Sequence, residues 1–278
     1  MAQHNQTRHV GFLIQNPTIL NEGLEGNEKV IMQLRTIRRN IEGYNDKQFE
    51  DVIVYYDGTE FIDKMKALKQ FDLIDIKGVF NILTVDKSSV CPICGHTNVK
   101  YKGSSTFIYP ISFSKLNNVQ GSFEYDENLP ETILRKHYKE VSNQVLIVGT
   151  VCSKPEMISN GRLKCCRYKL GVDRKYYIKT QTELTADYPW IYSYGKQAER
   201  DYRHLKEGSV VLVDSFIHTR QVDAKITCEK CGTDYTYPDV VTDFIPYSVE
   251  YFGNYKTDED IALEEELKKR ELISLMNS

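Results

Sequence analysis

The chain has 278 residues, which is enough for two domains of ordinary size. Its formal net charge is -3, with 36 basic and 39 acidic residues, so any nucleic-acid site must be a local patch rather than a general positive field. The first residues lack the apolar stretch of a secretory signal, and no apolar run reaches the roughly 20 residues that span a bilayer. We therefore expect no contact with membranes.

The N-terminal part of the chain predicts five strands and one short helix. After a flexible start at 1–8, apolar and β-branched runs indicate strands at 10–14, 29–37, 51–56, 73–83 and 106–113. The pattern at 59–68 predicts a helix between the third and fourth strands.

A connecting segment follows, with an irregular loop expected at 117–127. Residues 130–140 predict a helix, because Pro130 suits its first turn. The C-terminal part then repeats the strand plan, with strands expected at 145–152, 162–172, 188–194, 210–220 and 240–249. A turn-rich loop is expected at 155–161, a short helix at 196–205, and a C-terminal helix at 257–276.

The two sets of strands are copies of one plan. Leu68 to Gly95 aligns with Leu205 to Gly232 without a gap, at a constant offset of 137 residues (205 − 68 and 232 − 95). Solenoid repeats have periods of roughly 20–50 residues, whereas this period has the length of a small domain. Three strands, a helix and a two-stranded hairpin is the order of a five-stranded Greek-key barrel of the OB type.

The predicted fold class is therefore all-β dominated, with two tandem OB-fold barrels. Each barrel has a short helix, and a helical connector and a C-terminal helix complete the chain. The expected division is a flexible N-terminus at 1–8, a first OB domain at 9–114, a connector at 115–143, a second OB domain at 144–255 and a C-terminal helix or tail at 256–278.

Residues 195–220 carry a resemblance to a known family. They read Gly195-Lys-Gln-Ala-Glu199, then Leu205-Lys-Glu-Gly-Ser209, and end at Thr219-Arg220. This pattern resembles the bacterial single-stranded DNA-binding protein family, and the resemblance covers about 145–252. The family's members mostly carry one barrel and form tetramers, so two fused barrels imply a dimer of chains with four barrels. The family's acidic tail is absent here, and we expect replication or recombination proteins to bind the C-terminal helix instead.

An unpaired nucleic-acid strand needs flat aromatic surfaces for bases and cations for phosphates. Alternation places Tyr188, Trp190, Tyr192 and Tyr194 on one face of their strand, and in the resembling family this face carries the bases. Flanking candidates come from neighbouring segments: Arg167, Lys169, Arg174, Lys175, Tyr176, His218 and Arg220. The alternative is that the aromatic row only packs a barrel or an interface.

The matching face of the first copy carries Asp51 and Asp57, which repel phosphate. Its better candidates for nucleic-acid binding are Arg35, Arg38, Arg39 and Tyr55. We therefore predict an asymmetric protein, in which the second barrel binds mainly while the first assists or contacts other proteins. The alternative for the two adjacent arginines is an ordinary solvated loop.

Four of the seven cysteines form two CxxCG motifs, Cys91–Gly95 and Cys228–Gly232. Their spacing indicates a metal and a reducing compartment, hence a cytoplasmic location. Zn²⁺ prefers four ligands, and each motif supplies two. We predict one structural zinc held by Cys91, Cys94, Cys228 and Cys231 and shared by the two barrels. The alternatives are a site shared between chains, two disulfides, and two sites completed by distant side chains.

The leading hypothesis is a non-catalytic protein that binds single-stranded DNA in replication or recombination, with RNA as an alternative ligand. The second hypothesis is an OB-fold scaffold of a replication or conjugation complex that mainly binds proteins. An enzyme is not expected, because the chain lacks a phosphate-binding loop, spaced carboxylate ligands and a paired nucleophile. A zinc with four thiolates also leaves no open coordination position for a substrate.

Overall fold

The computed structural model describes residues 4–24, 26–41, 44, 47–116, 128–160, 163–174 and 185–276. Its first half closes into a barrel of five strands, in the order β1 (His4–Leu13), β5 (Leu73–Val90), β6 (Thr97–Lys115), β4 (Phe49–Tyr56), β3 (Lys29–Ile37) and back to β1. The β4–β6 pair is parallel and the other pairs are antiparallel. A short strand, β2 (Thr18–Leu20), extends β3, and α1 (Ile62–Lys66) connects β4 to β5.

The second half repeats this ring strand for strand. It runs from β7 (Asn143–Val151) to β12 (Val210–Thr227), β13 (Asp234–Gly253), β11 (Trp190–Tyr194), β9 (Leu163–Asp173) and back to β7. The β11–β13 pair is again the parallel one. Helix α3 (Gly195–His204) takes the place of α1. A closed five-stranded ring with this strand order is the OB barrel, as the sequence predicts.

The halves are joined through an antiparallel pair formed by β1 and β7, at whose centre Thr7 lies opposite Val145. The two residues are also equivalent in the repeat, at an offset of 138, so a pseudo-two-fold axis passes between them. The hydrogen bonds agree with this symmetry. Asn5 bonds both backbone groups of Phe80, and Asn143 bonds both backbone groups of Ile217. The halves therefore meet as the subunits of an isologous dimer do.

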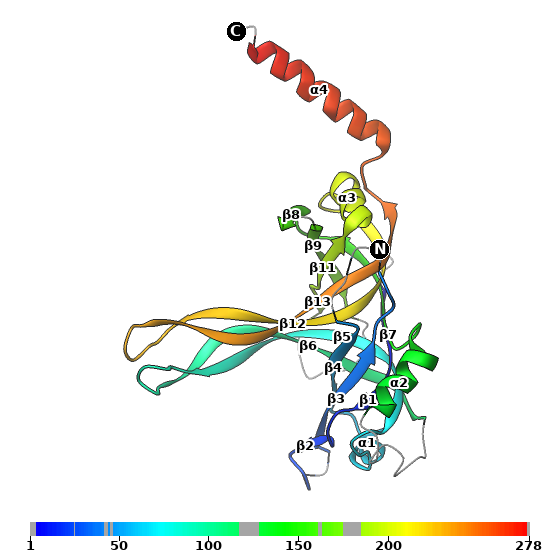
Figure 1. The fold of residues 1–278 in the computed structure, drawn as a ribbon, viewed down its shortest axis with the longest axis vertical. Coiled ribbons are helices and arrows are strands. Elements are labelled where there is room, and N and C mark those ends of the chain that lie inside the picture. The colour runs from blue at the N-terminus through cyan, green and yellow to red at the C-terminus, as the bar shows by residue number, and fades with distance from the viewer. Residues whose placement is uncertain are drawn as a thin grey trace.

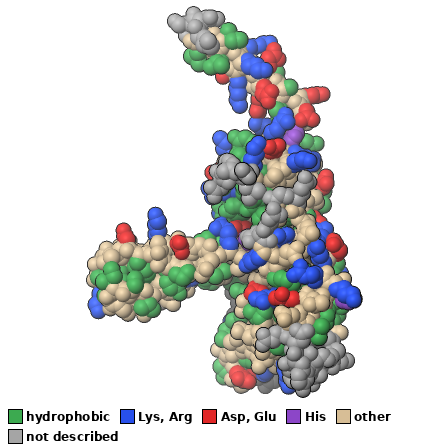
Figure 2. Space-filling model, viewed as in Figure 1, with side chains coloured by type: hydrophobic (Ala, Val, Ile, Leu, Met, Phe, Trp, Pro, Cys, Tyr) green, Lys and Arg blue, Asp and Glu red, His purple; other side chains and the backbone are tan. Residues whose placement is uncertain are grey.

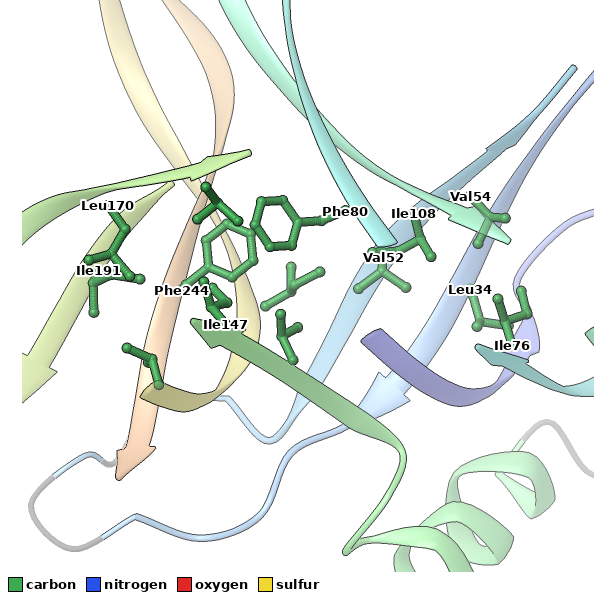
Figure 3. Close-up of a cluster of buried hydrophobic side chains, with 14 of the residues drawn as sticks. Leu34, Val52, Val54, Ile76, Phe80, Ile108, Ile147, Leu170, Ile191 and Phe244 are labelled. Carbon is green, nitrogen blue, oxygen red and sulfur yellow. The ribbon is translucent and has the colours of Figure 1, made fainter. Parts of the chain in front are cut away.

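A single hydrophobic core runs through both barrels. Val54 and Ile108 come from the first half and Leu170 and Ile191 from the second, all fully buried (Figure 3). The Phe80 and Phe244 rings meet between the halves, with centroids 4.8 Å apart.

The β5–β6 and β12–β13 hairpins are much longer than the barrels require. Figure 1 shows them leaving the body side by side as one arm. Along the arm, Lys87 forms an ion pair with Asp239, and the hydroxyls of Ser89 and Tyr235 lie 2.6 Å apart. The arm has few charged side chains in the view of Figure 2.

Several predicted boundaries need correction. The chain at 4–8 is not flexible, because β1 begins at His4 and pairs there with β5 and β7. The expected loop at 155–161 contains strand β8 (Glu156–Asn160), which pairs with β9. A two-residue strand, β10 (Ala186–Asp187), precedes β11. The four strands of the two hairpins continue to the CxxCG motifs, well beyond the bounds predicted for them at 83, 106, 220 and 240.

The remaining helices lie outside the barrels. The connector helix is shorter than expected, with α2 (Leu129–Ile133) continuing as one π-helical turn, η1 (Leu134–Tyr138). The expected irregular loop at 117–127 lies outside the described residues. Helix α4 (Asp258–Met276) projects from the second half (Figure 1). Within the described residues, no helix has the length and apolar character needed to cross a membrane.

Candidate nucleic-acid interface and metal centre

The aromatic row is presented on β11 as the alternation predicts. Ile191 and Ser193 point into the core and are fully buried, while Trp190, Tyr192 and Tyr194 are partly exposed on the other face. Tyr188 lies just before the strand and is 53% exposed. The core contacts of β11 are therefore made by Ile191 and Ser193, and the aromatic side chains of the row are not needed for them.

Cations lie over the row from the neighbouring strand β9. Lys169 is opposite Trp190 in the sheet register, and Arg167 is opposite Tyr192. The Lys169 ammonium is 4.9 Å from the centre of the Trp190 ring, and the Arg167 guanidinium is 5.5 Å from it. A hydrogen bond to Glu156 raises the pKa of Arg167. On β12, Arg220 lies 5.7 Å from the centre of the Tyr192 ring.

The other end of the row is covered by the first half. Tyr44, between β3 and β4, is buried, and its ring lies 4.8 Å from that of Tyr194. Burial raises the pKa of the Tyr194 hydroxyl above its ordinary value. His218 is also buried, with Nδ1 2.8 Å from the Glu50 carboxylate of the first half. The row is therefore most open at Tyr188, and at its far end the partly exposed Tyr194 packs against a residue of the first half.

The halves also exchange reciprocal polar contacts. The Glu50 carboxylate accepts a hydrogen bond from the Thr219 amide at 3.0 Å, and Asp187 accepts one from the Ile82 amide at 2.7 Å. The two contacts are equivalent in the repeat, because the two carboxylates and the two amide donors are each 137 residues apart (187 − 50 and 219 − 82). Arg174 belongs to this junction, because it pairs with the fully buried Asp187 and donates to the Ile82 carbonyl. The buried Arg174 and His218 consequently join the two halves and are not part of the open face.

The candidates in the first half are similarly engaged in protein contacts. Arg35 pairs with Asp51 at 2.8 Å and with Glu131 at 3.3 Å. Arg38 is buried and donates to the Lys47 and Arg39 carbonyl groups, and Arg39 pairs with Asp214 of the second half at 2.6 Å. The alternative prediction, that Arg38 and Arg39 lie in an ordinary solvated loop, is therefore wrong. Tyr55, the remaining candidate of the first half, packs against Phe107. Two candidates of the second half, Lys175 and Tyr176, lie outside the described residues.

Sequence reasoning missed two features of this surface. It did not predict that Tyr44 covers Tyr194. It also did not find Glu156 as the partner of Arg167. Both depend on contacts between segments that are distant in the sequence or were expected to be irregular, so no local pattern signals them.

The two CxxCG motifs meet at the tip of the arm. Cys91 Sγ lies 3.8 Å from Cys231 Sγ, and Cys94 Sγ lies 3.6 Å from Cys228 Sγ. All four sulfurs are within 4.8 Å of one another. The glycine that ends each motif has a positive φ, +67° at Gly95 and +69° at Gly232, so the two turns have the same shape.

These distances fit a metal better than disulfides. A tetrahedron with metal–sulfur bonds of about 2.3 Å has sulfur atoms about 3.8 Å apart. A disulfide would bring two sulfurs to about 2.05 Å. The structure thus brings together the four predicted ligands of one chain, two from each half, in an arrangement that can hold a metal ion.

Two closed five-stranded barrels, one of which carries a partly exposed aromatic row, define a tandem OB-fold protein. Residues 142–238 match the sequence model of the Single-strand binding protein family. This part of the second half is thus similar to that family, and the first half repeats the same strand order.

Individual proteins show a similar match. The chain is 34% identical over 85 residues to Single-stranded DNA-binding protein 2 of Clostridium acetobutylicum, an alignment covering 30% of this chain and 62% of that protein. It is 29% identical over 82 residues to Single-stranded DNA-binding protein 1 of Streptococcus pyogenes, again covering 62% of the relative. The chain thus spans less than two thirds of the length of these relatives.

The fold is shared over nearly the whole chain with a solved structure. The wild-type single-stranded DNA binding protein from Thermus aquaticus superposes with a TM-score of 0.59, covering 93% of this chain and 97% of that one. The sequence identity is 13%, so this comparison concerns the fold alone.

Proposed function

We propose that the protein is a non-catalytic single-stranded DNA-binding protein and that the strand lies on the open face of the second half. The observation that carries the proposal is the open end of the aromatic row, where Trp190 lies beneath Lys169 and Arg167 beside the exposed Tyr188. Bases stack on aromatic rings while neighbouring cations contact phosphates. The family of this half and the names of its relatives support the same ligand.

Within the proposed site, we assign the direct contacts to a smaller set of side chains than the sequence predicts. Tyr188, Trp190 and Tyr192 supply the stacking surfaces, and Arg167, Lys169 and Arg220 supply the positive charge. Lys175 and Tyr176 remain predictions from the sequence. The buried residues at the junction support the site indirectly, because they fix the first half against the second.

We further propose a role in coating or protecting single-stranded DNA during replication or recombination, in a reducing cytoplasm. A dimer of chains would supply four barrels. Helix α4 suits contacts with replication or recombination proteins, because it projects from the body and exposes Leu263, Leu267 and Leu272.

The second part of the proposal is a structural zinc at the tip of the arm. The four sulfurs have the spacing of a tetrahedral thiolate site, and they come equally from the two halves. Zinc supplies no catalysis there but ties the hairpins together. Elemental analysis of purified protein should give one zinc per chain. Two per chain would indicate separate sites, and none, with cysteines unreactive toward thiol reagents, would indicate disulfides.

The DNA-binding proposal is tested with Trp190, the single tryptophan of the chain. Its fluorescence is followed during titration with oligo-dT at low and high salt, with duplex DNA of equal length as the control. We expect strong quenching by oligo-dT, little by duplex, and weaker binding at high salt. An unchanged signal from folded protein, together with no binding of labelled oligo-dT, would favour the protein-binding scaffold. Asp51 and Asp57 on the matching face of the first half suit that role better than DNA binding.

A further inference from the structure

A cavity of about 440 Å³ lies at the junction where the first half meets the shielded end of the aromatic row. One wall is formed by Arg39 and Asn40 of the first half, and the other by Tyr194 and the residues after it. Tyr194 has the same parity on β11 as Trp190, so the cavity continues the row toward the first half. Its volume is within the roughly 300–1,000 Å³ of small-molecule sites.

The lining of this junction cavity suits a phosphate. Lys196 and Arg39 provide two cations and Asn40 provides an amide group, whereas the Gln197 amide in the same wall donates to Asp201. The described residues that form its wall include no carboxylate. Lys196 is exposed and forms no ion pair with the residues the structure describes, so its charge is available to a ligand.

The Arg39 side chain is held in place by its neighbours, but one of its hydrogen-bond donors has no partner among the described residues. Its guanidinium lies 3.7 Å from the centre of the Tyr247 ring and pairs with Asp214. Its buried Nε has no hydrogen-bond partner within the described part of the chain. Tyr194 and Tyr247 also give the cavity two aromatic walls, one from β11 and one from β13. Cations beside aromatic rings are the combination that a nucleotide unit requires.

We infer that the junction cavity binds one nucleotide of the bound strand, with its phosphate at Lys196 and Arg39. The strand then passes from the open face, beyond Tyr192, to the first half. This inference rests on the proposed DNA binding and adds to it, because it gives the first half a direct part in the site. On this inference, the strand leaves the aromatic row at Tyr194 and makes a second set of contacts in the junction cavity.

The test compares Lys196→Gln with Lys164→Gln as a matched control. Lys164 is also an exposed lysine of the second half, but it pairs with Glu199 away from the cavity. Binding of fluorescein-labelled oligo-dT is measured by anisotropy at several salt concentrations. One lost phosphate contact on a single strand reduces the magnitude of the log–log salt slope by about 0.7. It correspondingly weakens binding about 8-fold at 50 mM salt and about 3-fold at 200 mM.

Lys196→Gln should show both effects, and Lys164→Gln should show neither. The double variant with Arg39→Gln should lose less than the product of the two single effects, because both side chains serve one phosphate. If Arg39→Gln unfolds in a thermal melt, the result for Lys196→Gln alone decides. Wild-type protein that binds oligo-dT while Lys196→Gln retains its affinity and slope would overturn the cavity inference. Wild-type protein that does not bind at all would instead refute the proposed function.

Discussion

Replacing Trp190 by alanine should weaken DNA binding without unfolding the protein. The ring lies outside the core, whose contacts on this strand come from the buried Ile191 and Ser193. Truncation therefore leaves no cavity inside the barrel, and it removes cation–π contacts worth only about 0.5–1 kcal/mol at exposed sites. A stacked base is worth about 1–3 kcal/mol, which corresponds to a loss of affinity of about 5- to 150-fold.

The salt dependence distinguishes this loss from an electrostatic one. Trp190→Ala keeps Arg167 and Lys169, so its salt slope should equal that of the wild type. Lys169→Gln should instead reduce the magnitude of the slope by about 0.7.

Anisotropy of labelled oligo-dT is the suitable assay, because the variant lacks the tryptophan signal. Tyr202→Ala is the matched control, since this tyrosine is 50% exposed but lies on α3. If Trp190→Ala keeps its affinity within twofold while circular dichroism shows an intact fold, the strand does not lie on this face.

The other predictions concern the metal, the junction and pH. Cys228→Ser should lose the bound zinc in elemental analysis, whereas Cys152→Ser, which alters an exposed cysteine outside the cluster, should retain it; equal zinc in both would exclude the four-thiolate site. Glu50→Gln should cost about 1–3 kcal/mol in urea unfolding, because the buried carboxylate accepts hydrogen bonds from the second half; an unchanged midpoint would contradict this. Burial lowers the pKa of His9 from 6.5 to about 3, so the unfolded chain binds a proton that the native chain does not. The free energy of unfolding should then be highest above about pH 6.5 and fall by about 1.4 kcal/mol per pH unit below it, down to about pH 3. His9→Leu should flatten this dependence, and His137→Gln, at an exposed histidine, should not. Parallel curves for the wild type and both variants would refute the prediction.

The sequence was sufficient to predict the barrels because their signals are local. Strand β3 has the bounds predicted for it, and α3 differs from its predicted helix by one residue at each end. The parity of β11 also followed from alternation, which is a property of any half-buried strand. The prediction that the four cysteines of the two CxxCG motifs come together is confirmed, because equivalent segments of two copies can meet on a symmetry axis.

The sequence did not predict which of the candidate cations are engaged elsewhere. Arg174 and Arg220 are both basic residues near the ends of strands, yet the side chain of the first is 7% exposed and that of the second 41%. Each pairs with a buried carboxylate, Asp187 for Arg174 and Asp243 for Arg220. Arg174 in addition donates to the Ile82 carbonyl of the first half, and that placement depends on how the barrels dock. Such contacts join residues far apart in the chain, as Glu50 and His218 are, so no spacing encodes them.

The contacts that hold the halves together follow the pseudo-two-fold symmetry, whereas the face proposed to bind single-stranded DNA does not. Asn5 and Asn143 make the same backbone contacts in the two halves, and the thiolate pairs are exchanged by the same axis. The aromatic row breaks this symmetry, because the positions equivalent to Tyr188 and Tyr194 are Asp51 and Asp57. A strand that followed the symmetry would meet carboxylates on the first half. We therefore expect it to reach that half at the junction cavity, where Arg39 and Lys196 lie beyond the end of the row.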